Sequence, residues 1–173
     1  LHGNPQITFF KSVFKRHTNF AIESIAQQIN GEFNFEERVS VKVERNGDLL
    51  SKCLLEITVE NRSGSNNLYK MLTNNGFTFI DYIEVEIGGQ IIDKHYGEWL
   101  NIWNELTLTY DKSIMLQRLI ETRKYMPSHN NNKIKTFYIP LNFWFCRHFG
   151  SALPLISLQY HDVVFNIKFN KAE

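Results

Sequence analysis

The sequence predicts an all-β fold of short antiparallel strands, interrupted by one helical insertion at about residues 97–124. Apolar and polar residues alternate along several segments, and turn signals such as Asn-Gly and Gly-Gly separate these segments. Phe, Trp, Val and Ile, which fit a pleated and half-buried surface, are concentrated between residues 137 and 169. Between residues 97 and 124 the apolar residues recur instead at helical spacing, which marks the insertion.

The composition is typical of one folded domain without a strongly charged partner. A chain of 173 residues with 43% hydrophobic residues can bury a sizeable core. Its formal net charge of +1 lacks the basic excess of a typical nucleic-acid-binding protein, so no specific nucleic-acid partner is expected. No apolar run approaches the ~20 residues of a transmembrane helix. Cys53 and Cys146 lie far apart within apolar runs, and we expect buried free thiols rather than a disulfide framework.

Residues 1–18 are predicted to form an N-terminal arm ahead of the folded domain, 19–173. The apolar residues of the arm gather on one helical face, and its basic residues fall elsewhere. Such an arm can contact nucleic acid or a membrane surface, or it can pack on its own domain or a neighbouring subunit. The short basic run favours packing. The residues expected to make these assembly contacts are Ile7, Phe9, Phe10, Phe14, Lys11, Lys15 and Arg16.

The first half of the domain is predicted to hold three strands, at residues 19–29, 33–44 and 49–59. Valines alternate with polar residues in the second of these strands, as expected of a strand with one buried face. Asn46-Gly47 separates the second strand from the third, which predicts a hairpin between them.

A second hairpin is predicted from residues 77–87 and 90–96, which are joined by Gly88-Gly89. Two glycines between strands suit a two-residue turn that needs positive φ. They are not a phosphate-binding loop, because the further Gly and Lys of that motif are absent.

One or two helices are predicted next, over residues 97–109 and 113–124. Trp99, Trp103 and Leu106 lie at helical spacing in the first helix. An aromatic stripe at this spacing usually belongs to the core, so these side chains are expected to be buried.

Residues 137–169 are predicted to form a strand, a turn and a longer strand. The apolar run at residues 137–141 leads into an aromatic cluster, and the longer strand is expected at residues 155–169. Apolar residues occupy even positions up to residue 160 and odd positions from residue 163. Because a slip of one residue exchanges the two faces of a strand, we expect a bulge or bend near His161 and Asp162.

The sequence contains no arrangement of residues that predicts chemistry. The six histidines are scattered without metal-ligand spacing, and neither cysteine belongs to a CxxC motif. We therefore expect no catalytic residue, no metal site and no cofactor, and His161 is expected to be structural. Asn61 begins the tripeptide Asn-Arg-Ser, which makes it a candidate glycosylation site, although this tripeptide is common by chance.

Many short strands without βαβ alternation predict a sandwich or barrel. The eight-stranded jelly roll is one such closed solution, and capsid proteins, lectins and cupins all use it. A cupin enzyme would need a histidine cluster, which this sequence lacks, whereas a lectin remains compatible with the pattern.

Three blocks of the sequence resemble one family. They are NPQITFFKSVFKRHTNFAIES at residues 4–24, FIDYIEVEIGGQIIDKHYGEWL at residues 79–100 and FYIPLNFWFCRHFGSALPLISLQYHDV at residues 137–163. With the segment RNGDL at residues 45–49, they resemble the major capsid protein of large nucleocytoplasmic DNA viruses. The resemblance implies a tandem pair of jelly rolls, of which this chain matches the first. It also implies a homotrimer that forms a pseudo-hexagonal capsomer.

The same resemblance implies the setting of the protein. Many capsomers would tile an icosahedral shell over an inner membrane, in contact with minor and penton capsid proteins. Such a protein would assemble in the host cytoplasm and reside in the virion. On this basis we expect a structural protein and no enzyme, and we expect that Glu173 is not the natural C-terminus. The alternatives are a stand-alone jelly roll that binds a carbohydrate or receptor, and a minor or penton capsid protein.

Overall fold

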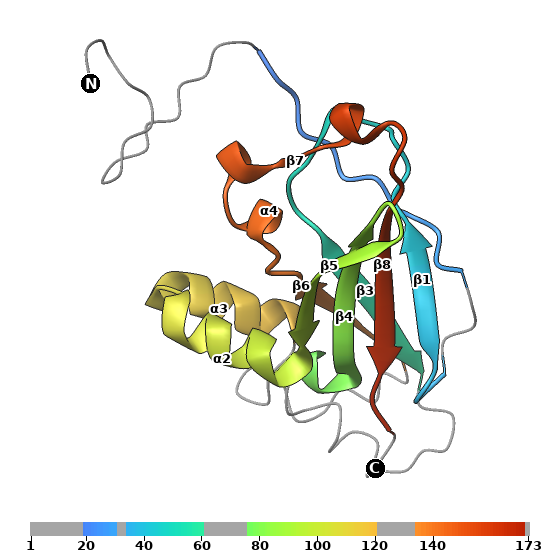
Figure 1. Cartoon of the computed structure of the whole chain (residues 1–173). Coiled ribbons are helices and arrows are strands. Elements are labelled where there is room, and N and C mark those ends of the chain that lie inside the picture. Colours follow the sequence, from blue (N-terminus) through green and yellow to red (C-terminus); the bar gives the residue numbers. More distant parts are fainter. Residues whose placement is uncertain (1–18, 31–33, 61–75, 121–133, 172–173) are drawn as a thin grey trace.

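A computed structural model describes residues 19–30, 34–60, 76–120 and 134–171. Antiparallel strands form two layers that enclose one apolar core (Figure 1). The front layer is a four-stranded sheet in the order β1 (Arg38–Lys42), β8 (Val163–Phe169), β4 (Ile80–Ile87) and β5 (Gln90–Tyr96). Behind it, β3 (Leu54–Glu60) pairs with β6 (Ile134–Pro140). The two-residue strands β2 (Leu49–Leu50) and β7 (Leu153–Pro154) pair with each other in a separate small sheet.

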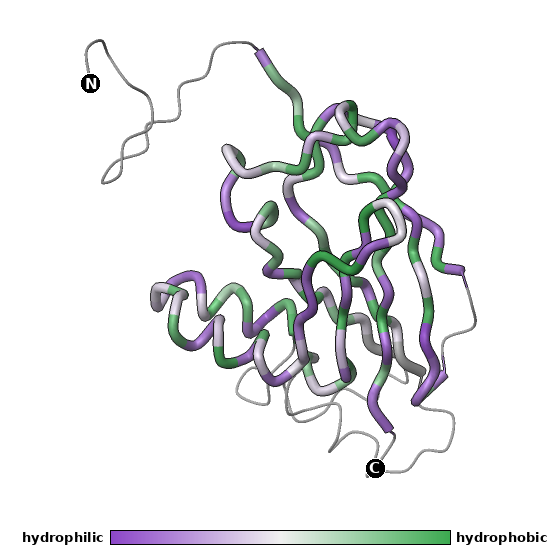
Figure 2. Tube along the Cα trace, in the orientation of Figure 1, coloured by the Kyte–Doolittle hydropathy of each residue, from purple (hydrophilic) through white to green (hydrophobic). Residues whose placement is uncertain are grey.

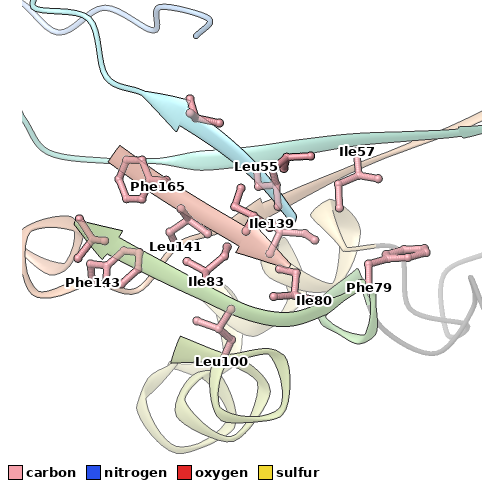
Figure 3. Packing of buried hydrophobic residues seen from close by; sticks show 14 of the residues in the cluster. Leu55, Ile57, Phe79, Ile80, Ile83, Leu100, Ile139, Leu141, Phe143 and Phe165 are labelled. Atoms are coloured by element: carbon pink, nitrogen blue, oxygen red, sulfur yellow. The ribbon is translucent and has the colours of Figure 1, made fainter. Parts of the chain in front are cut away.

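The core lies between the two layers because alternate side chains of each strand point inward. In the centre of the four-stranded sheet, Phe165 of β8 lies opposite Val41 of β1 on one side and Val85 of β4 on the other. Figure 3 shows side chains from both layers, together with one from the first helix, gathered in the same space. The labelled residues are Leu55, Ile57, Phe79, Ile80, Ile83, Leu100, Ile139, Leu141, Phe143 and Phe165.

The hairpin predicted at the two consecutive glycines is confirmed. β4 and β5 pair antiparallel, and Gly88 and Gly89 adopt φ values of 60° and 86°. These positive φ values match the tight turn type that suits the twist of paired strands. Gly88 is also confined by space, because a Cβ atom at this position would lie 2.6 Å from Nδ1 of His161. The predicted strand begins later than expected, since a short 3₁₀ helix, η1 (Gly76–Phe79), precedes β4.

The helical insertion is confirmed as two helices, α2 (Gly97–Thr107) and α3 (Tyr110–Leu119). Leu100 of α2 is buried in the core, and hydrophobic and hydrophilic residues alternate along both helices (Figure 2). Gly97 allows α2 to begin close to the sheet, because any side chain here would meet the backbone carbonyl oxygens of Phe77 and Ile80. The last predicted helical residues, 121–124, lie outside the described residues.

The first predicted strand, at residues 19–29, is wrong. This segment runs without strand structure, and within the described residues its end meets the sheet only through a bridge between Asn30 and Ser40. Two backbone hydrogen bonds, of 2.8 and 3.2 Å, form that bridge. Alternating apolar residues are not sufficient for a strand, since the backbone must also find a partner. The side chain of Phe20 is consequently 67% exposed.

The hairpin predicted at Asn46-Gly47 is also wrong. β1 pairs with the distant β8, and β3 pairs with β6, so the chain crosses between layers at this turn instead of folding back. The strand predicted at residues 33–44 is shortened to β1, and the one predicted at 49–59 is divided into β2 and β3. Both segments carry one apolar face, and that face reaches the shared core equally well from either layer.

The long strand predicted at residues 155–169 is replaced by two elements. Residues 155–158 form a 3₁₀ helix, η4 (Leu155–Leu158), and the strand β8 begins only at Val163. Of the bulge or bend predicted near His161 and Asp162, the bend is confirmed at His161. The change of phase marks the turn that precedes the new strand. Tyr160, expected on the buried face, is 89% exposed.

The turn expected after β6 contains further helical elements. These are α4 (Trp144–Arg147) and the 3₁₀ helix η3 (Phe149–Ser151). Phe143 and Phe145, at the start of this region, are completely buried and lie 5.8 Å apart between ring centroids. The aromatic cluster thus closes one side of the core.

Candidate functional site

No site for metal chemistry is evident in the part of the chain that the structure describes. It brings together no group of three His, Cys, Asp or Glu residues that could hold a metal ion. His148 is occupied locally, since its Nδ1 accepts a hydrogen bond of 2.9 Å from the Gly150 backbone N–H. His161 lies against Gly88, and the neighbouring Asp162 pairs with Lys42 at 2.7 Å. The expectation that this protein has no catalytic or metal site stays a prediction.

His95 is held in an aromatic stack inside the molecule. Its ring lies between Trp99, with ring centroids 4.2 Å apart, and Phe143, with ring centroids 4.5 Å apart. Nε2 lies 3.2 Å from a carboxylate oxygen of Asp93, while Nδ1 is buried without a hydrogen-bond partner among the described residues. Burial lowers the pKa of His95, an effect that Asp93 opposes and Arg147 reinforces. The imidazole is therefore neutral at neutral pH and acts as a packing group.

The same stack attaches helix α2 to the region after β6. Trp99 stacks on Trp103 at 5.4 Å, and the guanidinium group of Arg147 lies 4.2 Å from the centroid of the Trp103 ring. The Nε–H of Arg147 donates a hydrogen bond of 3.0 Å to the Asn142 carbonyl. Trp99 packs against the core but is only half-buried, and Trp103 is half-buried as well, so the predicted burial of the two tryptophans is confirmed only in part.

The two helices expose a set of large apolar side chains, which we call the helix-pair surface. Leu106, expected in the core, is 79% exposed, so that part of the prediction is wrong. Beside these side chains, a shallow groove of about 160 Å³ between α2 and α3 is smaller than the pockets that hold typical small-molecule ligands. The helix-pair surface consists of Ile102, Leu106, Tyr110, Met115 and Leu119.

A second apolar set, which we call the loop-end surface, lies at the end of the molecule opposite the C-terminal end of β8 (Figure 1). It combines the segment 19–30 with the connections around η3 and η4. The hydrogen bond from the Leu155 backbone N–H to the Asp48 carbonyl, at 2.9 Å, ties these connections to the loop before β2. The loop-end surface consists of Phe20, Ile22, Phe149, Ile156 and Tyr160.

The outer face of the four-stranded sheet is charged. Glu84 of β4 is buried by its neighbours and pairs with Arg38 of β1 at 3.2 Å and with Lys94 of β5 at 2.9 Å. The hydrogen bond with Glu84 raises the pKa of Lys94, whose ammonium also lies 3.7 Å from the centroid of the Tyr82 ring. This network links three strands across the sheet, and each of its three charged side chains is paired within it.

The site residues predicted from the sequence cannot be compared with these surfaces. Asn61 lies outside the described residues, as does the whole assembly arm: Ile7, Phe9, Phe10, Phe14, Lys11, Lys15 and Arg16. The helix-pair surface was not predicted, because every apolar residue at helical spacing was assigned to the core. The excess of apolar residues beyond one face of α2 was the signal that could have revealed it.

No helix in the described ranges is long and apolar enough to cross a membrane. The described fold thus combines a two-layered β core with apolar outer surfaces. Exposed apolar surfaces are typical of a structural or binding protein.

Comparisons with known proteins decide the family. A family model described as "Major capsid protein N-terminus" matches residues 8–173. The major capsid protein of Pyramimonas orientalis virus is 49% identical over 173 residues, which cover 98% of this chain and 43% of the relative. The major capsid protein of Paramecium bursaria Chlorella virus 1 is 42% identical over 167 residues, which cover 94% of this chain and 36% of the relative.

The fold agrees with this assignment. A quasi-atomic model of the PBCV-1 virus capsid matches with a TM-score of 0.76 and 35% sequence identity, covering 95% of this chain and 38% of that chain. The chain therefore belongs to the major capsid protein family of large double-stranded DNA viruses and matches its N-terminal domain. This is a family of structural capsid proteins, not of enzymes. The chain spans about two fifths of the length of the curated relatives it matches.

Proposed function

We propose that this chain is the first of two jelly rolls in a protein that forms trimeric, pseudo-hexagonal capsomers of a large icosahedral virus. One observation carries the proposal: the chain matches the PBCV-1 capsid over 95% of its own length but over only 38% of that chain. The unmatched remainder of the relative is long enough for another domain of similar size.

The strand pairing supports an eight-stranded jelly roll with the helices as an insertion. β1 and β8, the first and last strands described, are neighbours in the sheet, and β3 pairs with β6 across the two helices. Neighbours that lie far apart along the chain are the mark of Greek-key connections, from which jelly rolls are built. The domain would extend over residues 19–173, with residues 1–18 as its arm.

The exposed apolar surfaces support assembly into a shell. Contiguous apolar patches are uncommon on monomeric proteins, and obligate interfaces bury large apolar areas. The helix-pair surface and the loop-end surface lie on different parts of the molecule, so they suit two kinds of neighbour (Figure 1). One of the two surfaces would form the trimer by closed threefold symmetry, and the other would make the lateral contacts between capsomers.

The N-terminal arm completes the proposal. Its apolar residues would be costly to leave in water, and its basic residues suit an acidic partner. We place it on the inner side of the shell, against a neighbouring capsomer, a minor or penton capsid protein, or the viral membrane. Assembly would occur in the host cytoplasm and the mature protein would reside in the virion.

A size measurement on the full-length protein tests the proposal. Native mass spectrometry is expected to find a trimer of chains more than twice the mass of this domain, and electron microscopy to find hexagonal particles. A full-length protein that stays monomeric and binds a carbohydrate on a glycan array would contradict the capsomer and support a stand-alone binding module.

Deletion of residues 1–18 tests the arm separately. The trimer is expected to persist, because the arm is assigned to contacts outside it, while the yield of closed shells should fall. The matched control replaces Lys11, Lys15 and Arg16 by Gln and retains the apolar residues, which separates the charge of the arm from its apolar face. Normal shell assembly after the deletion would exclude the role given to the arm.

A further inference from the structure

His95 is a buried histidine with a partner for only one of its two ring nitrogens. Its side chain is 7% exposed, and Nε2 lies 3.2 Å from a carboxylate oxygen of Asp93. Nδ1 is buried and has no hydrogen-bond partner among the described residues. A neutral imidazole suits this arrangement, because Nε2 can carry the single proton and donate it to Asp93, while Nδ1 has no hydrogen to place.

A protonated His95 does not fit the same site. Both ring nitrogens then carry a hydrogen, and the N–H at Nδ1 would be a buried donor without an acceptor. The rings of Trp99 and Phe143, with centroids 4.2 and 4.5 Å away, attract a cation. They lie on the faces of the imidazole, however, whereas the Nδ1–H bond lies in its plane. An imidazolium therefore obtains an acceptor for Nδ1–H only when the stack opens to water.

Two charged groups near His95 act on its protonation in opposite directions. The carboxylate of Asp93, which is 34% exposed, favours the imidazolium. The guanidinium of Arg147, 6.0 Å from the centroid of the Trp99 ring, disfavours a second positive charge. The two effects partly cancel, so the burial of the ring determines the balance. In agreement, the pKa of His95 is lowered, with burial as the largest cause.

The other titratable residues of the elements around His95 provide no partner for Nδ1. The ammonium of Lys94, the preceding residue of β5, pairs with a carboxylate on the outer face of the sheet. The two glutamates of α2 are exposed. Cys146 of α4 and Cys53 before β3 are free cysteines, as expected, but they are only half-buried, so the expectation of buried thiols is wrong. The effect of a proton on His95 thus depends on the ring and its two charged neighbours.

Helix α2, which contributes Trp99 to the stack, is attached to the rest of the domain through few side chains. Within α2, all of which the structure describes, only the side chains of Leu100 and Asn104 are buried. The Asn104 side-chain oxygen accepts a hydrogen bond of 3.2 Å from Asn142. Most residues of the central strand β8 are buried instead. Because local opening occurs where buried contacts are few, a change at His95 should affect α2 before the sheet.

We propose that His95 is a pH-sensitive latch: protonation of its ring opens the stack with Trp99 and loosens α2 from the sheet, while the two-layered β core stays folded. The proton comes from solvent and returns to it as the pH rises, so the change is reversible and needs no other reactant. Because α2 carries Ile102 and Leu106, the helix-pair surface would be altered at low pH. The inference goes beyond the proposed function, and the latch does not depend on assembly.

Amide hydrogen exchange of the full-length protein, measured on peptides by mass spectrometry, tests the latch. The protection factor compares each observed rate with the intrinsic rate at the same pH, so it reports the opening equilibrium. From pH 8 to pH 5.5 the protection factor of residues 97–107 should fall by up to about tenfold, because opening takes up one proton below the ordinary pKa of 6.5. Residues 163–169 should stay more protected at both pH values. Protection of α2 that is independent of pH, or equal to that of β8, would overturn the proposal.

Variants identify the titrating group. His95→Phe keeps a flat ring in the stack and removes the titrating nitrogen, so the protection factor of residues 97–107 should be the same at pH 8 and pH 5.5. His95→Gln makes the same test if the phenylalanine variant does not fold. His148→Gln changes an exposed histidine outside the stack and should retain the fall seen in the unchanged protein. A fall that persists without His95, or one that disappears without His148, would overturn the assignment of the latch to His95.

Discussion

The imidazole of His95 lies against the indole of Trp99, with ring centroids 4.2 Å apart and ring planes 28° apart. This contact, continued by Phe143 on the other side of His95, joins β5, α2 and the chain after β6. It places a titratable group in a site that favours its neutral form.

Stability is therefore predicted to depend on pH through His95. Its pKa is lowered in the folded protein, mainly by burial, so below its ordinary value of 6.5 the unfolded chain binds a proton that the folded chain does not. The free energy of unfolding should be highest above pH 6.5 and fall as the pH drops below it, by at most about 1.4 kcal/mol per pH unit from this residue. Urea unfolding between pH 5 and pH 8 measures the slope.

The variant His95→Gln should remove this part of the pH dependence, whatever its effect on stability at pH 8. His148→Gln is the matched control, because His148 is an exposed histidine outside the stack. If His148→Gln reduced the dependence of the unfolding free energy on pH as much as His95→Gln does, a group other than His95 would be responsible for that dependence.

The aromatic cluster after β6 is predicted to be a major source of stability. Phe143→Ala removes a completely buried ring that contacts His95, Phe145 and Phe165, and should cost about 3–5 kcal/mol of unfolding free energy. Phe149→Ala makes the same chemical change at a half-exposed position and should cost less than about 1 kcal/mol. Denaturant unfolding compares the two. Similar losses would contradict the placement of Phe143 in the core.

The turn between β4 and β5 is predicted to require glycine for two separable reasons. Gly88→Ala faces both a positive φ of 60° and the ring of His161, and should destabilise the protein by about 2–3 kcal/mol. Gly89→Ala faces only the positive φ, of 86°, and should cost about 1 kcal/mol. Gly47→Ala, with open space and no positive φ, should be nearly neutral. Thermal unfolding of the three variants should give this order, and an equal effect of all three would refute it.

The helix-pair surface is predicted to serve assembly rather than folding. Leu106→Ser changes a side chain that is 79% exposed, so the free energy of unfolding of the isolated chain should change by less than about 1 kcal/mol. If this surface meets a neighbour in the shell, trimers or shells should form at lower yield. Glu98→Gln, at an exposed polar position of the same helix, is the control. Unchanged assembly of the Leu106 variant would exclude this surface from the interfaces.

Several elements were predictable because their signals are local. The two consecutive glycines identify the turn between β4 and β5, since positive φ at adjacent residues selects for glycine. The change to helical spacing after residue 96 identifies α2 and α3. The resemblance to a capsid family came from long blocks of sequence, and the comparisons confirm it. The assembly arm and Asn61 stay predictions, because they lie outside the described residues.

The sequence by itself determined which segments have an apolar face and with what period, because period depends only on the local geometry of helix and strand. Only the tertiary structure decided which segment lies opposite which. Residues 19–29 alternate but have no strand partner in the described structure, whereas Val41 meets Phe165 across the whole length of the domain. The stack around His95 likewise arises when distant segments close on one core. Several segments could cover the same apolar face of a strand. Only the packing of all segments together selects one neighbour for each strand.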